Sequence, residues 1–103
     1  MSENRVVYIS GPISGLPMDQ VEKSFNDYKR KLIHEGCIVR NPLDISPYHP
    51  DKTWKDYMKD DIVALLDCNE IHMLPGYESS RGALLEMHIA LQLSIKLKIV
   101  KDD

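Results

Sequence analysis

The chain of 103 residues is poor in cysteine, has no long hydrophobic run and carries little excess of charge of either sign. Its two cysteines, Cys37 and Cys68, lie far apart without CxxC spacing, so we expect buried, unpaired thiols in a reducing cytoplasm. No apolar run approaches the ~20 residues that span a membrane. Residues 1–5 are polar and lead directly into a strand-like run, so we expect no signal peptide.

Metal-ligating pairs and basic clusters are also missing. The four histidines form no HxxxH or HxH pair, so we expect no metal site. The formal net charge is −3, and the densest basic run, residues 29–31, has the spacing of a solvated helix face. We therefore expect neither a nucleic-acid polymer nor a membrane surface as a partner. The length and the 43% content of hydrophobic residues predict one globular domain over residues 1–103.

What is present is a regular alternation of strand-like and helix-like segments, without repeats. This order predicts a parallel sheet of about four strands with right-handed crossovers and helices on both faces, a three-layer α/β sandwich. The strand-like runs are residues 5–10, 37–40, 70–74 and 97–100, and the helix-like segments are residues 19–35, 53–67 and 81–94.

The helices differ in their patterns. The first has apolar residues at spacings of four, three and four, and Gly36 suits its end. Thr53 and Asp56 resemble a capping box for the second, and residues 43–52 before it are expected to be a loop. Met58, Ile62, Leu65 and Leu66 form the apolar stripe expected of the second helix. The third is apolar almost all round, which is typical of a helix buried on more than one side.

In a parallel sheet of this kind, ligands bind beyond the carboxyl ends of the strands, where the strand order reverses. Three loops are expected there: residues 11–18, 41–52 and 75–80. The first contains Gly11 and Gly15 and follows a strand, so its backbone N–H groups are available to a phosphate. It lacks the GxGxxG spacing and the ending of a P-loop, and a tight structural turn is nearly as good an explanation.

The start of the third helix is more informative. Ser79 and Ser80 are good N-cap residues, and Gly82 removes a side chain from the first turn. Glycine destabilises a helix by roughly 1 kcal/mol relative to alanine, so a close approach of ligand or backbone would explain it. The helix N-terminus presents unpaired N–H groups and a partial positive charge. The alternative is an ordinary helix cap.

Two carboxylates complete the candidate site. Glu86 lies one turn after Gly82 inside the apolar third helix, where an unpaired buried charge is costly. It either faces a cavity or is a solvent-edge residue that pairs with Arg81 or a lysine. Asp61, four residues after Tyr57, is expected at the boundary of the core. Two carboxylates at one ligand edge suit glycosidic chemistry, although spacing alone does not show that they meet.

Together these residues resemble the nucleoside 2-deoxyribosyltransferase superfamily, especially its compact single-domain branch, and are similar to deoxynucleoside 5′-monophosphate N-glycosidases. The superfamily has a flavodoxin-like, or Rossmann-like, parallel α/β fold. The matching stretches are residues 8–15, Asn41 and Pro42, then Trp54, Met58 and Asp61, and finally residues 74–83 with Glu86 and Ala90.

The resemblance implies a mechanism. Glu86 falls where the family has a glutamate that attacks C1′ of the sugar, and Asp61 matches an aspartate that protonates or positions the base. Tyr8 matches a tyrosine near the nucleophile, so the expected catalytic residues are Glu86, Asp61 and Tyr8. Ser80 falls where nucleoside transferases have an acidic residue and relatives acting on 5′-monophosphates have a serine.

An aspartate at that position would repel a phosphate, whereas a serine at a helix N-terminus donates a hydrogen bond to it. The expected ligand is thus a nucleotide in preference to a nucleoside, with no metal or organic cofactor. A homo-oligomer, a dimer or larger, is expected from the family. The predicted substrate-binding residues are Gly11, Ile13, Ser14, Gly15, Asn41, Ser79, Ser80 and Gly82.

Three hypotheses for function follow. The first is an enzyme, an N-glycosidase or deoxyribosyltransferase acting on a nucleotide through a glycosyl–Glu86 intermediate. The second is a non-catalytic nucleotide-binding module of the same fold. The third is a nucleotide-monophosphate hydrolase with a PGGxGTxxE loop, which Pro75, Gly76, Gly82 and Glu86 match only in part and which would prefer ribonucleotides.

Overall fold

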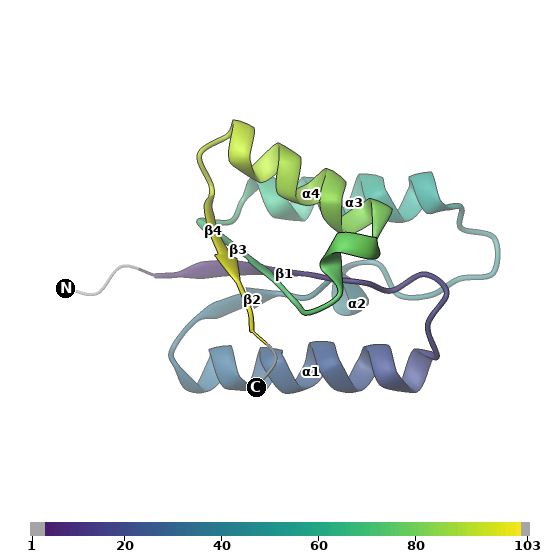
Figure 1. Cartoon of the computed structure of the whole chain (residues 1–103), viewed down its shortest axis with the longest axis horizontal. Helices are drawn as coiled ribbons and strands as arrows, with labels where there is room; N and C mark the ends of the chain where they lie inside the picture. Colours follow the sequence, from purple (N-terminus) through teal and green to yellow (C-terminus); the bar gives the residue numbers. More distant parts are fainter. Residues whose placement is uncertain (1–3, 102–103) are drawn as a thin grey trace.

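A parallel four-stranded sheet with the order β2-β1-β3-β4 forms the middle layer of the computed structural model (Figure 1). The structure describes residues 4–101. Residues 1–3 and 102–103, the two ends of the predicted domain, lie outside the described residues. The expectation of no signal peptide rests partly on residues 1–3. The strands are β1 (Val6–Ser10), β2 (Ile38–Arg40), β3 (Glu70–Met73) and β4 (Lys96–Ile99).

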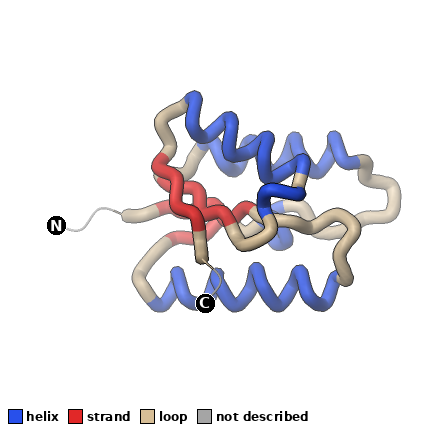
Figure 2. Tube along the Cα trace, viewed as in Figure 1, coloured by secondary structure: helices blue, strands red, loops and turns tan. Residues whose placement is uncertain are grey.

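Helices cover both faces of the sheet, which confirms the predicted three-layer α/β fold (Figure 2). Helix α1 (Met18–His34) covers one face, and helices α3 (Trp54–Leu66) and α4 (Arg81–Gln92) cover the other. Two short elements, α2 (Pro42–Ile45) and η1 (Tyr77–Ser79), lie in the connections. No helix in the described part of the chain is long and apolar enough to cross a membrane.

The two central strands are buried on both faces because successive side chains alternate between the two helical layers. Val7 and Ile9 pack in the core beneath α1, whereas Tyr8 packs in the core beneath α3 and α4. The edge strands β2 and β4 are only partly covered. The alternation matters for the site because Tyr8 and Ser10 share the face that α4 covers.

Local signals placed two helices correctly. The predicted stripe of α1 is buried, and Gly36 adopts a φ of +89° directly after the helix, a conformation that favours glycine. The capping box of Thr53 and Asp56 is present at the start of α3. The two cysteines are buried and unpaired, as expected.

Three details differ from the predictions. Residues 42–45 form a short helix where a loop was expected, because Asn41 caps it and Pro42 suits its first position. Leu66 is 52% exposed and therefore does not belong to the buried stripe of α3. Helix α4 is buried along one face only, since Leu84 and Leu91 are exposed to solvent.

A chain of polar side chains crosses the core on the α1 side of the sheet. Arg5 donates two hydrogen bonds to Glu70, at 2.7 and 3.0 Å, and His72 Nε2 lies 2.8 Å from Oε1 of the same carboxylate. His72 Nδ1 lies 2.5 Å from the Tyr28 hydroxyl. The hydrogen bonds from Arg5 and His72 lower the pKa of Glu70 to about 2 despite its burial. Because the carboxylate only accepts, Nε2 carries the proton and Nδ1 accepts from Tyr28.

This chain predicts acid-sensitive stability. The folded-state pKa of Glu70 is depressed, so its ionisation stabilises the fold above its ordinary pKa of about 4.5 and this contribution is lost as the pH falls toward about 2. We expect the free energy of unfolding, measured by urea titration at pH 6 and pH 3, to fall less in Glu70→Gln than in the wild type. Glu22→Gln is the control, because it removes an exposed carboxylate of α1 that forms no ion pair within residues 4–101, and it should keep the acid dependence of the wild type. An unchanged acid dependence in Glu70→Gln would contradict the assignment.

Candidate active site

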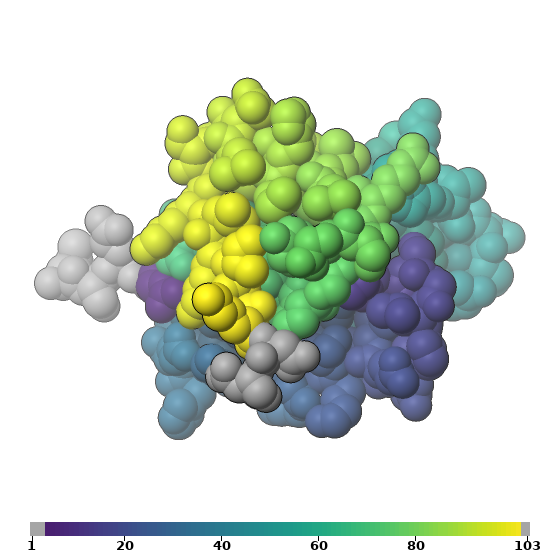
Figure 3. All heavy atoms as spheres, in the orientation of Figure 1, coloured from purple at the N-terminus to yellow at the C-terminus, as the bar shows by residue number. Residues whose placement is uncertain are grey.

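A cavity of about 1260 Å³ opens beyond the carboxyl ends of β1 and β3, the point at which the strand order reverses. Residues from the three loops predicted to meet at this edge line it, together with side chains of α3 and α4. Figure 3 shows the loop after β1, the teal segment near residue 50 and the green segment before α4 adjoining at the right-hand end of the molecule.

Glu86 lies in the second turn of α4 and is only 5% exposed, yet its carboxylate lines the cavity. The Tyr8 hydroxyl donates to Oε2 and the Ser10 hydroxyl donates to Oε1, each at 2.7 Å. Both donors stand on the same face of β1, so the strand fixes the carboxylate from two adjacent inward positions. In the described part of the chain no lysine or arginine forms an ion pair with Glu86, so the alternative of pairing with Arg81 does not hold.

Burial raises the pKa of Glu86 to about 7, and the hydrogen bonds from Ser10 and Tyr8 act in the opposite direction. The hydroxyl of Tyr8 in turn stays protonated, because burial and the adjacent Glu86 raise its pKa well above 10. Near neutral pH, Glu86 is therefore a carboxylate whose ionised and protonated forms are both populated. Such a group is poised for nucleophilic or acid–base chemistry.

Asp61 supplies the second carboxyl group of the cavity. It lies on α3, is 6% exposed and lines the same cavity, so it is buried where a position at the core boundary was expected. Among the described residues its Oδ1 is a buried polar atom without a hydrogen-bond partner. Burial, and then the negative charge of Glu86, raise the pKa of Asp61 to about 8, and Lys52 opposes this shift.

The two carboxyl groups influence each other's ionisation. Once Glu86 ionises, its negative charge opposes the ionisation of Asp61 and so raises the pKa of Asp61. A pair of titratable groups whose environments separate an acid from a base is the arrangement expected for proton transfer combined with nucleophilic attack.

The beginning of α4 forms another wall of the cavity. Ser80 is the N-cap residue, and its hydroxyl oxygen accepts from the backbone N–H of Ala83 at 3.2 Å. Ser79 lies one position too early to cap α4, and its hydroxyl donates to the carbonyl of Gly76. A Cβ at position 82 would lie 3.1 Å from Sδ of Met58. Gly82 therefore allows close packing of α4 against α3.

The first loop reaches the cavity with Gly11, Ile13, Ser14 and Gly15. A Cβ at position 11 would lie 2.9 Å from Cβ of Leu74, so packing between the ends of β1 and β3 accounts for Gly11. Gly15 has a φ of +82°, which accounts for the second glycine as a turn residue. The binding roles predicted for these residues remain predictions.

Two of the predicted site residues do not line the cavity. Asn41 is buried, its Oδ1 caps α2 by accepting from the N–H of Leu43, and its Nδ2 donates to Asn26. Tyr8 lies behind Glu86 and reaches the cavity only through that carboxylate. The structure brings the other predicted residues to the cavity, namely Glu86, Asp61, Gly11, Ile13, Ser14, Gly15, Ser79, Ser80 and Gly82.

Several groups at the site were not predicted. Ser10 holds Glu86, and its position two residues after Tyr8 on a strand is the sequence signal for it. Trp54 lines the cavity together with Met58 and Asp61 of the same helix, α3. The segment of residues 46–52 forms the outer wall, and the Tyr57 hydroxyl hydrogen-bonds the backbone of His49. Within residues 4–101 no group of three side chains is suited to hold a metal ion.

Fold and site together define a parallel α/β protein with a buried pair of carboxyl groups at its switch point. The chain belongs to a family described as a domain of unknown function (DUF4406), whose model matches residues 5–100. Among solved structures, the chain is similar to 2-deoxyribosyltransferase from the psychrotolerant bacterium Bacillus psychrosaccharolyticus, with a TM-score of 0.70. The identity is 15%, and the match covers 91% of this chain and 70% of that chain. No curated protein matches the sequence.

At this identity the similarity shows the fold alone. The comparison therefore confirms the fold that the resemblance in the sequence implies. The two proteins share this fold over most of the present chain.

The buried site predicts a gain of stability when its charge is removed. The folded-state pKa of Glu86 is raised, so the folded protein resists losing a proton that the unfolded chain releases near pH 4.5. Stability should fall between about pH 4.5 and 7, and Glu86→Gln should recover about 1–3 kcal/mol of unfolding free energy at pH 8. Little change is expected at pH 4.

Thermal and urea unfolding at both pH values check this expectation. Glu22→Gln, which neutralises an exposed carboxylate that lines the same cavity, is the matched control and should leave stability nearly unchanged. A loss of stability in Glu86→Gln at pH 8 would show that the ionised carboxylate stabilises the fold. That result would contradict the claim that the buried charge of Glu86 destabilises it.

Proposed function

We propose that this protein breaks the N-glycosidic bond of a deoxynucleoside 5′-monophosphate through a covalent glycosyl–Glu86 intermediate, with hydrolysis or transfer to another base as the outcome. The observation that carries the proposal is the pair of buried carboxyl groups in one cavity. Glu86 is held by Tyr8 and Ser10, and Asp61 lines the same cavity and has a buried oxygen without a hydrogen-bond partner among the described residues. The fold shared with a 2-deoxyribosyltransferase supports the same choice.

In the first step an oxygen of the Glu86 carboxylate attacks C1′ of the sugar, and the C1′–N bond breaks. The electron pair of that bond goes to the base nitrogen, and Asp61 gives its proton to the departing base. The raised pKa of Asp61, about 8, keeps this proton in place at neutral pH. The hydrogen bonds from Tyr8 and Ser10 fix the attacking carboxylate and leave a lone pair on each oxygen.

In the second step water attacks C1′ and gives its proton to the Asp61 carboxylate, while the bond between C1′ and Glu86 breaks. The sugar phosphate leaves, and both carboxyl groups return to their starting states. If the nitrogen of a second base attacks instead of water, the result is transfer of the sugar. Tyr8 has no direct contact with the cavity, so its role here is to position Glu86.

The choice of a nucleotide over a nucleoside rests on the start of α4. No acidic residue lies in its first turn, and Ser80 at the N-cap has a hydroxyl proton available to an anion. An acidic residue at this position would repel a phosphate.

Base release tests the proposal. The protein is incubated with each deoxynucleoside and ribonucleoside 5′-monophosphate, with and without a free base as acceptor, and released base is measured by chromatography. We expect release from at least one substrate, a loss of about 10³-fold or more in Glu86→Gln, and a loss of about 10²–10⁴-fold in Asp61→Asn. Glu22→Gln is again the matched control.

The rival hypotheses give different results. Nucleotide binding by the wild type without base release under any condition would overturn the enzymatic proposal and favour a binding module. A preference for ribonucleotides would favour the third hypothesis, a nucleotide-monophosphate hydrolase of the PGGxGTxxE type.

A further inference from the structure

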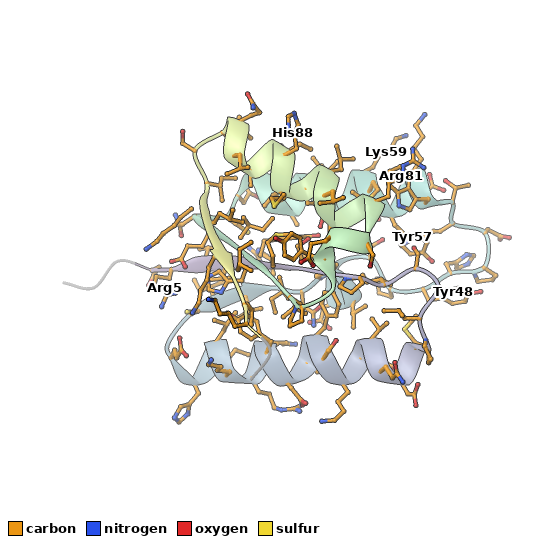
Figure 4. All side chains as sticks on the ribbon, in the orientation of Figure 1. Arg5, Tyr48, Tyr57, Lys59, Arg81 and His88 are labelled. Atoms are coloured by element: carbon orange, nitrogen blue, oxygen red, sulfur yellow. The ribbon has the colours of Figure 1, made fainter. Side chains whose placement is uncertain are left out.

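The rim of the cavity carries an arginine stacked on a tryptophan. Arg81 is the first residue of α4 and Trp54 is the first residue of α3, so the packing of the two helices brings them together. The guanidinium carbon of Arg81 lies 4.0 Å from the centroid of the Trp54 ring. Both residues contribute to the cavity lining. Figure 4 shows Arg81 at the same end of the molecule as Tyr48 and Tyr57, and Arg5 at the opposite end.

The guanidinium has no acidic partner. Within residues 4–101 no carboxylate forms an ion pair with Arg81 and no side-chain hydrogen bond engages it. The lysine of the lining, Lys52, is engaged: it donates to Ser46 and to the carbonyl of Pro47, and lies 3.6 Å from Asp60. Among the described lining residues, Arg81 is thus the cation free to receive an anion.

We propose that Arg81, packed over the ring of Trp54, is the specificity-determining residue that binds the 5′-phosphate of the substrate. This inference rests on the proposed function and assigns the phosphate end of that site. A guanidinium stacked on an aromatic ring keeps its N–H donors free in its own plane, where they match two oxygens of a phosphate. The stacking also limits the rotamers of the arginine, so less freedom is lost on binding.

The charge distribution of the cavity favours the same orientation. The ionised carboxylate of Glu86 repels a phosphate from the reacting atoms, whereas the guanidinium of Arg81 and the start of α4 attract it. Arg81 precedes Glu86 by five residues, a rise of about 7.5 Å along the helix. The two side chains therefore leave α4 at different heights and in different directions, and both line the cavity.

Calorimetric titration tests the assignment in the Glu86→Gln background, which prevents turnover. The probes are the deoxynucleosides, their 5′-monophosphates and their 3′-monophosphates. Adding Arg81→Gln should weaken binding of 5′-monophosphates by about 10–100-fold and change nucleoside binding by less than about twofold. Lys59→Gln removes the same charge from an exposed position of α3 that does not line the cavity, and should change neither.

Equal weakening of nucleosides and 5′-monophosphates by Arg81→Gln would overturn the inference, as would equal weakening of the 3′- and 5′-monophosphates. The proposed function fails differently. Base release by the wild type with an Arg81-independent preference for nucleotides would overturn this inference alone. Arg81-dependent binding of 5′-monophosphates without base release would overturn the proposed reaction alone.

Discussion

The burial of one carboxylate, Glu86, is the constraint on which the rest of the site depends. Helix α4 packs so closely on the sheet that Ala83 and Ala90, on the same face as Glu86, are fully covered. A carboxylate in that layer loses its hydration, and two hydroxyls of β1 replace only part of it. Strand β1 can supply both because every second residue of a strand faces the same way.

The burial of the Glu86 carboxylate lowers the free energy of unfolding. In a layer of close-packed side chains, an apolar residue at position 86 would fit without desolvating a charge. The chain instead keeps Glu86 on α4 and Asp61 on α3, and their mutual repulsion raises the cost of ionising both. Buried carboxyl groups with raised pKa values, gathered at the switch point of a parallel sheet, are characteristic of functional sites.

The opposite face of the sheet shows what a structural polar cluster looks like in the same molecule. There Glu70 is matched by Arg5 and His72, and its pKa is lowered to about 2. Glu86 has hydroxyl donors and no cation, and its pKa is raised to about 7. The two glutamates sit on either side of one thin sheet. The difference between their pKa values comes from the deeper desolvation of Glu86 and from the hydrogen bonds of Arg5 and His72 to Glu70.

Much of the fold could be predicted because its signals are local. The stripe of α1, the capping box of Thr53 and the alternation of β1 each depend on a few neighbouring residues. The four-residue helix α2 was missed because it is too short for any periodicity to register. Leu66 was expected in a buried stripe, and the third helix was expected to be buried on more than one side. Both expectations were wrong because hydrophobicity alone does not show which apolar positions a small sheet is wide enough to cover.

The sequence predicts which residue types make up the site better than it predicts which residues they contact. Glu86 and Asp61 stand out as carboxylates on apolar helices, but the unpartnered oxygen of Asp61 depends on how α3 packs. For Gly11 and Gly82 the sequence left open a close approach of a ligand or a structural reason, and Leu74 and Met58 occupy the space that a Cβ would need. The stacking of Arg81 on Trp54 joins residues far apart in the sequence, and only the packing of α4 on α3 reveals it.

The most direct test of the central claim is to look for the covalent intermediate on Glu86. The protein is mixed with a deoxynucleoside 5′-monophosphate that it turns over, quenched in acid within milliseconds and digested for mass spectrometry. The account predicts a sugar-phosphate adduct on the peptide that contains Glu86, absent from Glu86→Gln. Base release with no adduct on that peptide at any quench time, or an adduct on a different residue, would contradict it.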